Sequence, residues 1–329
     1  MILVVGATGQ LGTAVVRRLI AAGRAVRAFV RPGSSARAVP GVELALGDLC
    51  VPEDIDLACR NAEAVICTAN SVLPAPGDRL GDVEHRGYGN LLEACRRHGV
   101  GQFVFISAPV TPLDTKVPTI RWKRWNEGRI RESGISYTIF RASPFMDSWL
   151  AMIGSRLPLR DSENPTLGRP FWFSRAYLRA VGNLIERNGW ALVQGPPERV
   201  TSFLAVRDAA AFLVNAIGHP SAIDATFDIG GPEPLSWVDV VEIFSRVLGR
   251  PIRAFPVAPA VYRALQLLWK PFSAAASNQM GLNWLLASSD SVVDMKEMAP
   301  LFGVSLTSVE TFLREKAGIE EREGSSVSA

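Results

Sequence analysis

The first twelve residues constrain the fold of this chain more than any other segment. They read MILVVGATGQLG, an apolar run that ends in three glycines spaced G-x-x-G-x-x-G, at Gly6, Gly9 and Gly12. A helical pattern of apolar residues follows at once, at Leu11, Val15, Val16, Leu19 and Ile20. The order predicts a strand, a tight turn and a helix, which together form the unit that holds the pyrophosphate of a dinucleotide.

Each glycine has a physical task in such a turn. Gly6 permits the tight turn, Gly9 lets the backbone approach the phosphates, and Gly12 lets the helix pack close to the strand. The bare amides and the positive end of the helix then face the anion. The same turn contributes the other residues that we expect to contact the cofactor: Thr8, Gln10 and Leu11. A purely structural glycine turn is the alternative.

The residue after the second expected strand, Val26–Val30, indicates which dinucleotide binds. An NAD site usually carries Asp or Glu here to hold the ribose 2′-hydroxyl, whereas this chain has Arg31. A guanidinium can clamp a 2′-phosphate with two parallel hydrogen bonds; Ser34 or Ser35 could add hydroxyls, and Arg37 could share the role. We therefore expect NADP(H) rather than NAD(H), the alternative being that Arg31 is a solvated surface residue.

Composition excludes several classes of protein. The 35 basic and 32 acidic residues among 329 are too balanced to predict a nucleic-acid surface. The four cysteines form no C-x-x-C pair and lie near no histidine cluster, so we expect neither a disulfide framework nor a metal site. We find no signal peptide and no run of 18 apolar residues, and we therefore expect a cytoplasmic protein without a transmembrane segment.

Strand and helix patterns alternate through the first 145 residues, which predicts an α/β fold with a doubly wound parallel sheet. We expect a dinucleotide-binding domain over 1–150, to which 201–232 returns. A smaller and mostly helical substrate or lid part would take 151–200 and 233–318, before a disordered tail at 319–329. The expected strands are Ile2–Val5, Val26–Val30, Val42–Leu46, Ala64–Cys67, Phe103–Ile106, Tyr137–Phe140, Phe203–Val206 and Thr226–Ile229; the clearest helices are Leu80–His98, Ile120–Ser133 and Arg207–Ile217.

Five segments together resemble the NmrA-like, atypical short-chain dehydrogenase/reductase family with its NAD(P)-binding Rossmann fold. They are the G-A-T-G-x-x-G turn, Gly47-Asp48-Leu49, the run from Lys123 and Glu127 to Arg141, Val206-Arg207-Asp208, and Asp228-Ile229-Gly230-Gly231-Pro232. The resemblance covers roughly residues 1–255. It implies that Asp48 and Leu49 lie beside the adenine. The C-terminal half is similar to the branch of photosystem-assembly and complex-I accessory proteins, some of which bind the dinucleotide without known turnover.

The usual proton donor is missing from its expected place. Short-chain reductases generally use Tyr-x-x-x-Lys, in which the phenol donates a proton and the ammonium holds the nicotinamide ribose. Here Thr119 stands four residues before Lys123. The resemblance assigns the ribose-holding role to Lys123, which we also consider as an acid, while a surface lysine is the alternative. Tyr88 and Tyr137 are candidate replacements for the phenol.

Further site residues are expected where strands end, because open α/β sheets bind ligands beyond the carboxyl ends of their strands. Ser107 is our second catalytic candidate, although its hydroxyl could merely cap the following turn. Other cofactor-contacting candidates follow the fourth and sixth strands: Thr68, Ala69, Asn70, Pro144 and Phe145. Phe145 could equally belong to the core.

Two functions remain open on these grounds. The first is an NADP(H)-dependent oxidoreductase that reduces a carbonyl or conjugated double bond of an apolar small molecule. The second is a non-catalytic NADP(H)-binding redox sensor or assembly factor. Aromatic and methionine side chains in 145–190 suit an apolar substrate site, and those in 260–287 could instead face a protein partner or a membrane surface.

Overall fold

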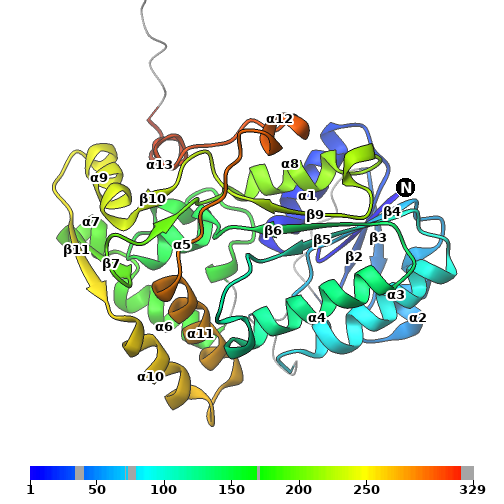
Figure 1. The fold of residues 1–329 in the computed structure, drawn as a ribbon, viewed down its shortest axis with the longest axis horizontal. Coiled ribbons are helices and arrows are strands. Elements are labelled where there is room, and N and C mark those ends of the chain that lie inside the picture. Colours follow the sequence, from blue (N-terminus) through cyan, green and yellow to red (C-terminus); the bar gives the residue numbers. More distant parts are fainter. Residues whose placement is uncertain (34–40, 71, 73–78, 169–170, 320–329) are drawn as a thin grey trace, which may run out of the picture.

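The computed structural model describes residues 1–33, 41–70, 72, 79–168 and 171–319 (Figure 1). Its main feature is a parallel sheet of seven strands in the order β3-β2-β1-β4-β5-β6-β9. This order reverses between β1 and β4, so the expected doubly wound Rossmann fold is confirmed. The strands are β1 (Ile2–Val5), β2 (Val26–Val30), β3 (Val42–Leu46), β4 (Ala64–Cys67), β5 (Gln102–Ser107), β6 (Tyr137–Ala142) and β9 (Ala225–Ile229).

Helices cover both faces of the sheet (Figure 1). On one face lie α1 (Gln10–Ala21) and α8 (Val206–Asn215), and on the other α2 (Pro52–Cys59), α3 (Tyr88–Arg97) and α4 (Pro118–Glu132). Side chains of one strand alternate between the two cores: Ile2 and Val4 face the first, Leu3 and Val5 the second. At the centre of the sheet both faces are buried, which is why β1, β4 and β5 are apolar at nearly every position.

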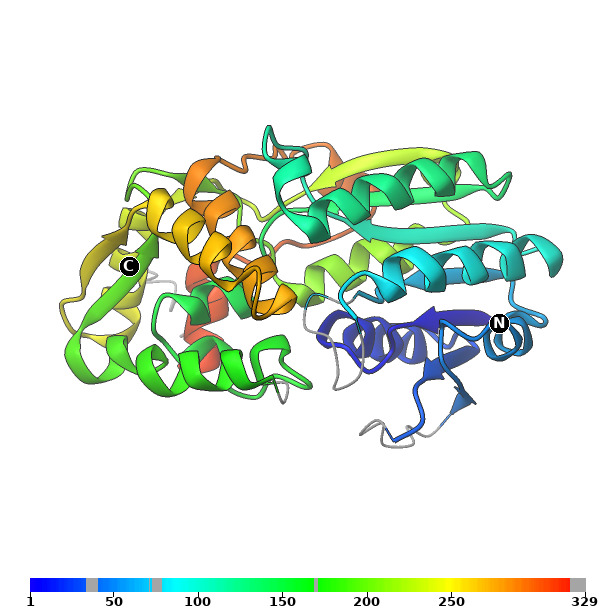
Figure 2. The same ribbon diagram turned by 90° about the horizontal axis from the view of Figure 1, so that it is seen from below.

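The rest of the chain builds a second body opposite the carboxyl ends of the strands (Figures 1 and 2). It holds two small sheets, in which β7 pairs with β11 in parallel and β8 with β10 antiparallel. Its elements are α5 (Met146–Met152), α6 (Trp172–Val181), α7 (Leu184–Asn188), β7 (Trp190–Gln194), β8 (Val200–Thr201), β10 (Leu235–Ser236), α9 (Trp237–Leu248), β11 (Arg253–Val257), α10 (Pro259–Trp269), α11 (Ala274–Ser288) and α13 (Val309–Ala317). The short helix α12 (Met298–Leu301) instead packs on the core of the main sheet, beside α8. No helix in the described ranges is long and apolar enough to cross a bilayer.

Two sequence expectations differ from the structure. The strand expected at 203–206 is absent: Phe203, Leu204 and Ala205 are buried connecting residues, with one isolated bridge from Leu204 to Phe145, and α8 already begins at Val206. A short run of apolar residues indicates that the segment is buried, but a buried segment need not form hydrogen bonds with a neighbouring strand. The helix expected from residue 80 begins as a π-helical turn at Val83–Gly87. The expected tail lies outside the described residues from 320 onward.

Candidate functional site: the cofactor cleft

The glycine turn has a shape that other residues could not adopt. Gly6 has a φ of 86°, and a β-carbon there would lie 2.7 Å from the backbone nitrogen of Ala69. A β-carbon on Gly12 would lie 2.0 Å from the carbonyl oxygen of Gly6. Gly9 precedes α1, which has no side-chain cap and no acidic residue in its first turn. The turn therefore presents bare helix amides, which fit the pyrophosphate of a dinucleotide.

The end of β4 packs directly against this turn. The hydroxyl of Thr68 donates to the carbonyl oxygens of Val5 and Gly6, at 3.2 and 3.3 Å. The carbonyl of Ala69 accepts a 2.8 Å hydrogen bond from the Tyr88 hydroxyl, and the Asn70 amide donates to the carbonyl of Thr68 at 3.4 Å. The structure thus brings these three expected residues, which follow β4, next to the glycine turn, where their backbone shapes the cleft.

On the expected adenine side, the residues after β2 and β3 differ in exposure. Arg31 is exposed at the carboxyl end of β2. Asp48 is half-buried and accepts a 2.8 Å hydrogen bond from the backbone N–H of Cys50. Leu49 is buried in the core formed with α2 and α3, so its side chain has a structural role. Three further residues considered for the 2′-phosphate lie outside the described residues: Ser34, Ser35 and Arg37.

Lys123 reaches from α4 to the carboxyl end of β5. Its Nζ donates a 2.7 Å hydrogen bond to the carbonyl of Ile106 and lies 5.2 Å from the centre of the Phe105 ring. Desolvation lowers the pKa of the ammonium to about 8, partly opposed by the nearby carboxylate of Glu84. A solvated surface lysine would not make these contacts, and the side chain is therefore built into the cleft wall.

Thr119 lies one helical turn before Lys123 on the same face of α4. Its side chain is 3% exposed, and its hydroxyl has no hydrogen-bond partner among the residues that the structure describes. The backbone N–H of Thr119 donates to the side-chain oxygen of Asn278 on α11 at 3.0 Å, and the amide nitrogen of Asn278 is also buried without a partner. Two unsatisfied polar atoms thus lie on neighbouring residues, at the position that corresponds to the tyrosine of the Tyr-x-x-x-Lys pattern.

The sequence analysis missed Asn278, although its signal was present. Helix α11 is buried nearly all round and carries polar side chains in an otherwise apolar stretch, among them Asn278 and Asn283. Such residues are expensive to bury without a partner. Polar residues within a long apolar helix could therefore have marked this one as the helix that faces the cleft.

Ser107 ends β5, and its hydroxyl takes part in a buried ionic network. It donates a 2.6 Å hydrogen bond to Glu127, whose other oxygen lies 2.7 Å from Arg141, and Arg124 also pairs with Glu127. Burial opposes ionisation of Glu127, but hydrogen bonds from Arg141 and Ser107 outweigh it and hold its pKa below the usual value. The network joins β5, β6 and α4. The hydroxyl of Ser107 is one of its members and therefore has a structural role.

The two candidate replacement phenols lie elsewhere. Tyr137 begins β6, so it lies at the amino end of the sheet, opposite the cleft. Tyr88 is 1% exposed and is engaged with the carbonyl of Ala69, and burial raises its pKa well above the ordinary value. Neither phenol is placed to act as a free acid at neutral pH.

Pro144 and Phe145 follow β6 and run beside residue 204. The carbonyl of Pro144 accepts from the backbone N–H of Leu204 at 3.1 Å, and Phe145 forms an isolated parallel bridge with Leu204. Phe145 is half-buried and packs against the core under α1 and α8. This segment is a fixed wall between the sheet and the second body.

A loop of the second body, 161–168, crosses the first turns of α1. Arg17 pairs with Glu163, the Asn164 amide donates to Thr13 at 3.2 Å, and Gln10 accepts from the backbone and hydroxyl of Thr166 at 3.2 and 3.1 Å. The side chain of Gln10 is therefore engaged with this loop, which closes one side of the glycine turn.

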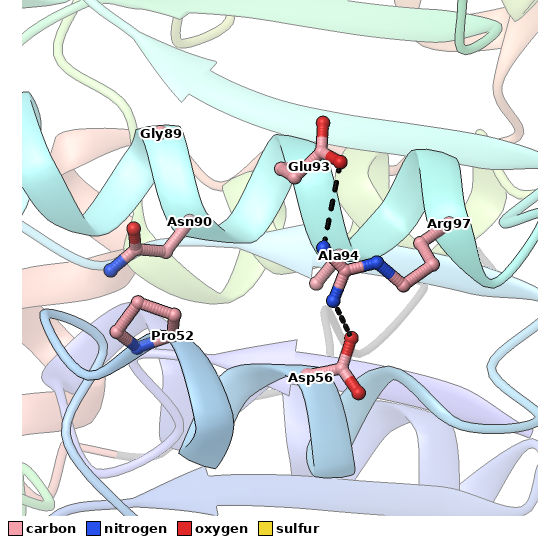
Figure 3. Close-up of a pocket in the computed structure, with 7 residues that line it drawn as sticks. All are labelled: Pro52, Asp56, Gly89, Asn90, Glu93, Ala94 and Arg97. Atoms are coloured by element: carbon pink, nitrogen blue, oxygen red, sulfur yellow. Dashed lines mark hydrogen bonds and ion pairs between the residues drawn. The ribbon is translucent and has the colours of Figure 1, made fainter.

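A separate hollow of about 260 Å³ lies between α2 and α3 (Figure 3). Arg97 spans it, pairing with Asp56 at 2.7 Å and with Glu93 at 3.6 Å. These charges satisfy one another, and the hollow lies outside the cleft formed by the strand ends. We assign it no ligand.

Comparison with known proteins connects this geometry to a family. The model of the NmrA-like family matches residues 1–285. Photosystem II assembly factor Ycf39 of Synechocystis sp. is 25% identical over 325 residues, which cover 96% of this chain and 90% of that protein. NAD(P)H azoreductase of Xenophilus azovorans is 29% identical over 255 residues, or 77% of this chain and 76% of the relative.

Solved structures show the same fold over almost the full length. NADPH-dependent quinone oxidoreductase QOR2 of Escherichia coli, complexed with NADPH, matches with a TM-score of 0.72 at 17% identity, covering 96% of this chain and 99% of the other. Triphenylmethane reductase of Citrobacter sp., complexed with NADP(H), matches with a TM-score of 0.72 at 18% identity, covering 96% and 100%. With the family model matched over most of its length, the chain belongs to the NmrA-like family.

Proposed function

We propose that this protein is an NADP(H)-dependent reductase that acts on a conjugated double bond or carbonyl of an apolar small molecule. The observation that carries the proposal is the ammonium of Lys123, held on the carbonyl of Ile106 at the carboxyl end of β5 with its pKa lowered to about 8. Keeping an ammonium in a desolvated position is energetically unfavourable, and groups with such perturbed pKa values cluster at functional sites.

The described residues fit the proposed cofactor along the whole cleft. The glycine turn and the first amides of α1 would hold the pyrophosphate. Arg31 at the end of β2 would take the 2′-phosphate, which is the basis for proposing NADP(H). Lys123 would hold the ribose on the nicotinamide side. When bound in reduced form, the nicotinamide supplies a hydride.

Proton supply decides which substrates the site suits. Thr119 is an aliphatic hydroxyl and a weak acid, but its hydroxyl and the Asn278 amide could donate hydrogen bonds to a substrate oxygen. Lys123, with a pKa of about 8, could polarise the same oxygen or return a proton from water. An acceptor whose reduced form takes its proton from water is therefore favoured over a simple ketone.

The walls of the second body suit an apolar acceptor. The residues next to α11 and α5 are aromatic side chains and methionines, which adapt to flat apolar ligands. They form two small clusters, which include Trp149, Met152, Tyr177, Tyr262, Trp269, Met280 and Trp284. Two structural neighbours that were solved with bound NADP(H) are named as a quinone oxidoreductase and a triphenylmethane reductase, which agrees with an apolar acceptor.

A second candidate function is a non-catalytic NADP(H)-binding accessory factor. The observation in its favour is that Thr119 occupies the usual position of the phenol, while Tyr88 is buried and donates its hydrogen bond to the carbonyl of Ala69. Likeness to Photosystem II assembly factor Ycf39 agrees with this alternative. In that case Lys123 would serve cofactor binding alone.

One experiment separates the two functions. Calorimetric titration with NADPH first measures binding, and NADPH absorbance then follows oxidation with a panel of quinones, enones, and simple aldehydes and ketones. The reductase proposal predicts oxidation with a quinone or enone, lost in Lys123→Met. Tight NADPH binding without oxidation by any acceptor would support the accessory factor. Absence of binding would contradict both functions.

A further inference from the structure

Helix α10 exposes its apolar side to solvent. Within α10 the exposed positions recur at helical spacing, at 260–261, 264 and 267–268, and all are apolar; directly after the helix Lys270, Pro271 and Phe272 are exposed. The exposed fractions rise toward the end of the helix, from 47% for Val261 through 51% for Leu267 and 59% for Leu268 to 76% for Phe272. A surface helix normally shows the opposite arrangement, with its apolar stripe on the core.

Polar contacts on the inner side fix this orientation. Gln266 is 5% exposed; its amide donates to the carbonyl of Lys116 at 3.2 Å and its side-chain oxygen accepts from Arg263 at 2.7 Å. Its backbone carbonyl accepts from Ser277 of α11 at 2.8 Å. Turning α10 to bury the leucines would break the two hydrogen bonds to Lys116 and Ser277, which lie outside the helix, so the stripe stays on the outside.

An exposed tryptophan from α6 extends the stripe. Trp172 is 51% exposed, and its ring centre lies 5.5 Å from that of Trp269 on α10. We name the α10 patch after five residues: Trp172, Val261, Leu267, Leu268 and Phe272. In Figure 1 α10 lies at the lower left end of the molecule, away from the sheet, so the α10 patch lies on a projecting end.

Only positive charges border the α10 patch in the two segments that form it. The ranges 164–185 and 243–289 contain no aspartate or glutamate, although the whole chain is nearly balanced at +3. Exposed cations lie on the same helices as the patch or directly after them, namely Arg175, Arg179 and Lys270. An interfacial helix presents the same features to an anionic bilayer: exposed apolar side chains, a tryptophan, and a border of basic residues without acidic ones.

We propose that the α10 patch docks this protein on the surface of a membrane that contains anionic lipid. Leu267, Leu268 and Phe272 enter the boundary between headgroups and acyl chains, Trp172 lies at the headgroup level, and the cations pair with lipid phosphates. The charge pattern favours lipid over a protein partner, because each cation on a lipid surface meets an abundant mobile anion.

Docking would also bring the cleft near the bilayer. Helix α11 packs on α10 through the Ser277 contact and reaches Thr119 through Asn278. The inference itself does not depend on turnover, and its test uses vesicles without cofactor or substrate, so the proposed function can fail while this one holds.

The test is flotation of the full chain with vesicles of phosphatidylcholine alone and of phosphatidylcholine mixed with phosphatidylglycerol. Leu268→Glu/Phe272→Glu removes the apolar contact, and Arg175→Glu/Lys270→Glu reverses the border charge. Leu57→Glu on α2, where the leucine is 54% exposed, is the matched control. All these positions are exposed, so melting temperatures should stay close to that of the parent.

We expect the parent and Leu57→Glu to bind anionic vesicles about tenfold or more tightly than neutral ones, and binding to weaken with salt. Both double variants should lose most of this binding. A parent that floats with neither kind of vesicle would overturn the inference, as would a Leu268→Glu/Phe272→Glu variant that floats like the parent. A parent dimer that this variant separates, without vesicle binding by either, would identify the α10 patch as a protein interface instead.

Discussion

The side-chain oxygen of Asn278 accepts a 3.0 Å hydrogen bond from the backbone N–H of Thr119, joining α11 of the second body to the first turn of α4. Both side chains are buried, and within the described part of the chain the Thr119 hydroxyl and the Asn278 amide nitrogen have no hydrogen-bond partner. Leaving such atoms unpaired is unfavourable by about 1–3 kcal/mol each. The pair is thus suited to an oxygen-bearing ligand.

Thr119→Val tests that role. If the hydroxyl has no partner in the free protein, replacing it with a methyl group should raise the free energy of unfolding by about 1 kcal/mol, while acceptor reduction falls. Thr138→Val is the control, because the Thr138 hydroxyl is buried and satisfied, donating to the carbonyl of Ala222 at 2.6 Å; it should destabilise by about 1 kcal/mol. Denaturant unfolding compares the two. Equal destabilisation would mean that the Thr119 hydroxyl already has a partner.

Lys123→Met should weaken NADPH binding and stabilise the free protein at pH 7. Its folded-state pKa of about 8 lies below the ordinary 10.5, so keeping the ammonium charged in the fold is unfavourable below about pH 8. That penalty, on the order of 1–3 kcal/mol, declines as pH rises from 8 to 10.5, where the unfolded chain holds more protons. Calorimetry and thermal unfolding measure both effects. Lys116→Met, at an exposed position, should change neither; a Lys123 variant that binds NADPH like the parent would place the lysine outside the site.

Arg31→Asp should reverse the cofactor preference from NADPH to NADH. Loss of a charge-assisted contact to the 2′-phosphate should weaken NADPH binding by about 1.5–3 kcal/mol, and a carboxylate can accept the ribose hydroxyl of NADH. Titration with each dinucleotide gives the ratio of affinities, with Arg18→Asp on exposed α1 surface as the charge control. If the parent bound the two cofactors with equal affinity, Arg31 would not be the residue that holds the 2′-phosphate.

Gly12→Ala and Gly128→Ala should have opposite effects. A β-carbon at Gly12 would lie 2.0 Å from a backbone oxygen, so the strand and the helix must move apart. This movement should lower the free energy of unfolding by about 1–3 kcal/mol or more. At Gly128, within α4, a β-carbon meets nothing within 4 Å, and alanine should stabilise the helix by about 0.5–1 kcal/mol. Chemical denaturation distinguishes the two signs. Gly12→Ala as stable as the parent would show that the turn tolerates a wider spacing.

Glu127→Gln should destabilise the protein by about 3 kcal/mol at pH 7, because Arg124 and Arg141 lose their shared counter-ion. The folded-state pKa of Glu127 is lowered, so its contribution is present above the ordinary pKa and is lost as pH falls through the folded value. Melting temperature should therefore fall less steeply with acid in Glu127→Gln than in the parent. Glu132→Gln, exposed on the same helix, should follow the parent; a Glu127 variant that does so as well would contradict the network.

The local pattern of glycines and apolar residues was sufficient to predict the glycine turn and the strands of the sheet. The strands β1 to β4 begin and end where they were expected, and β1 and β4 are apolar throughout because they are buried on both faces. The spacing of Gly6 and Gly12 required a close approach of backbone to backbone, and the structure has it. These features depend on residues near one another in the chain.

Sequence alone could not determine which side chains meet across the cleft. It placed Lys123 and Thr119 on one face of a helix, but Asn278, the partner of Thr119, is 159 residues away and only the packing of α11 brings it there. It proposed Ser107 for catalysis, while the buried network around Glu127 engages that hydroxyl. Nor does the periodicity of α10 say which side is buried; hydrogen bonds of Gln266 with distant residues decide that. Periodicity is a property of one segment, whereas a hydrogen bond between segments depends on how the whole chain packs.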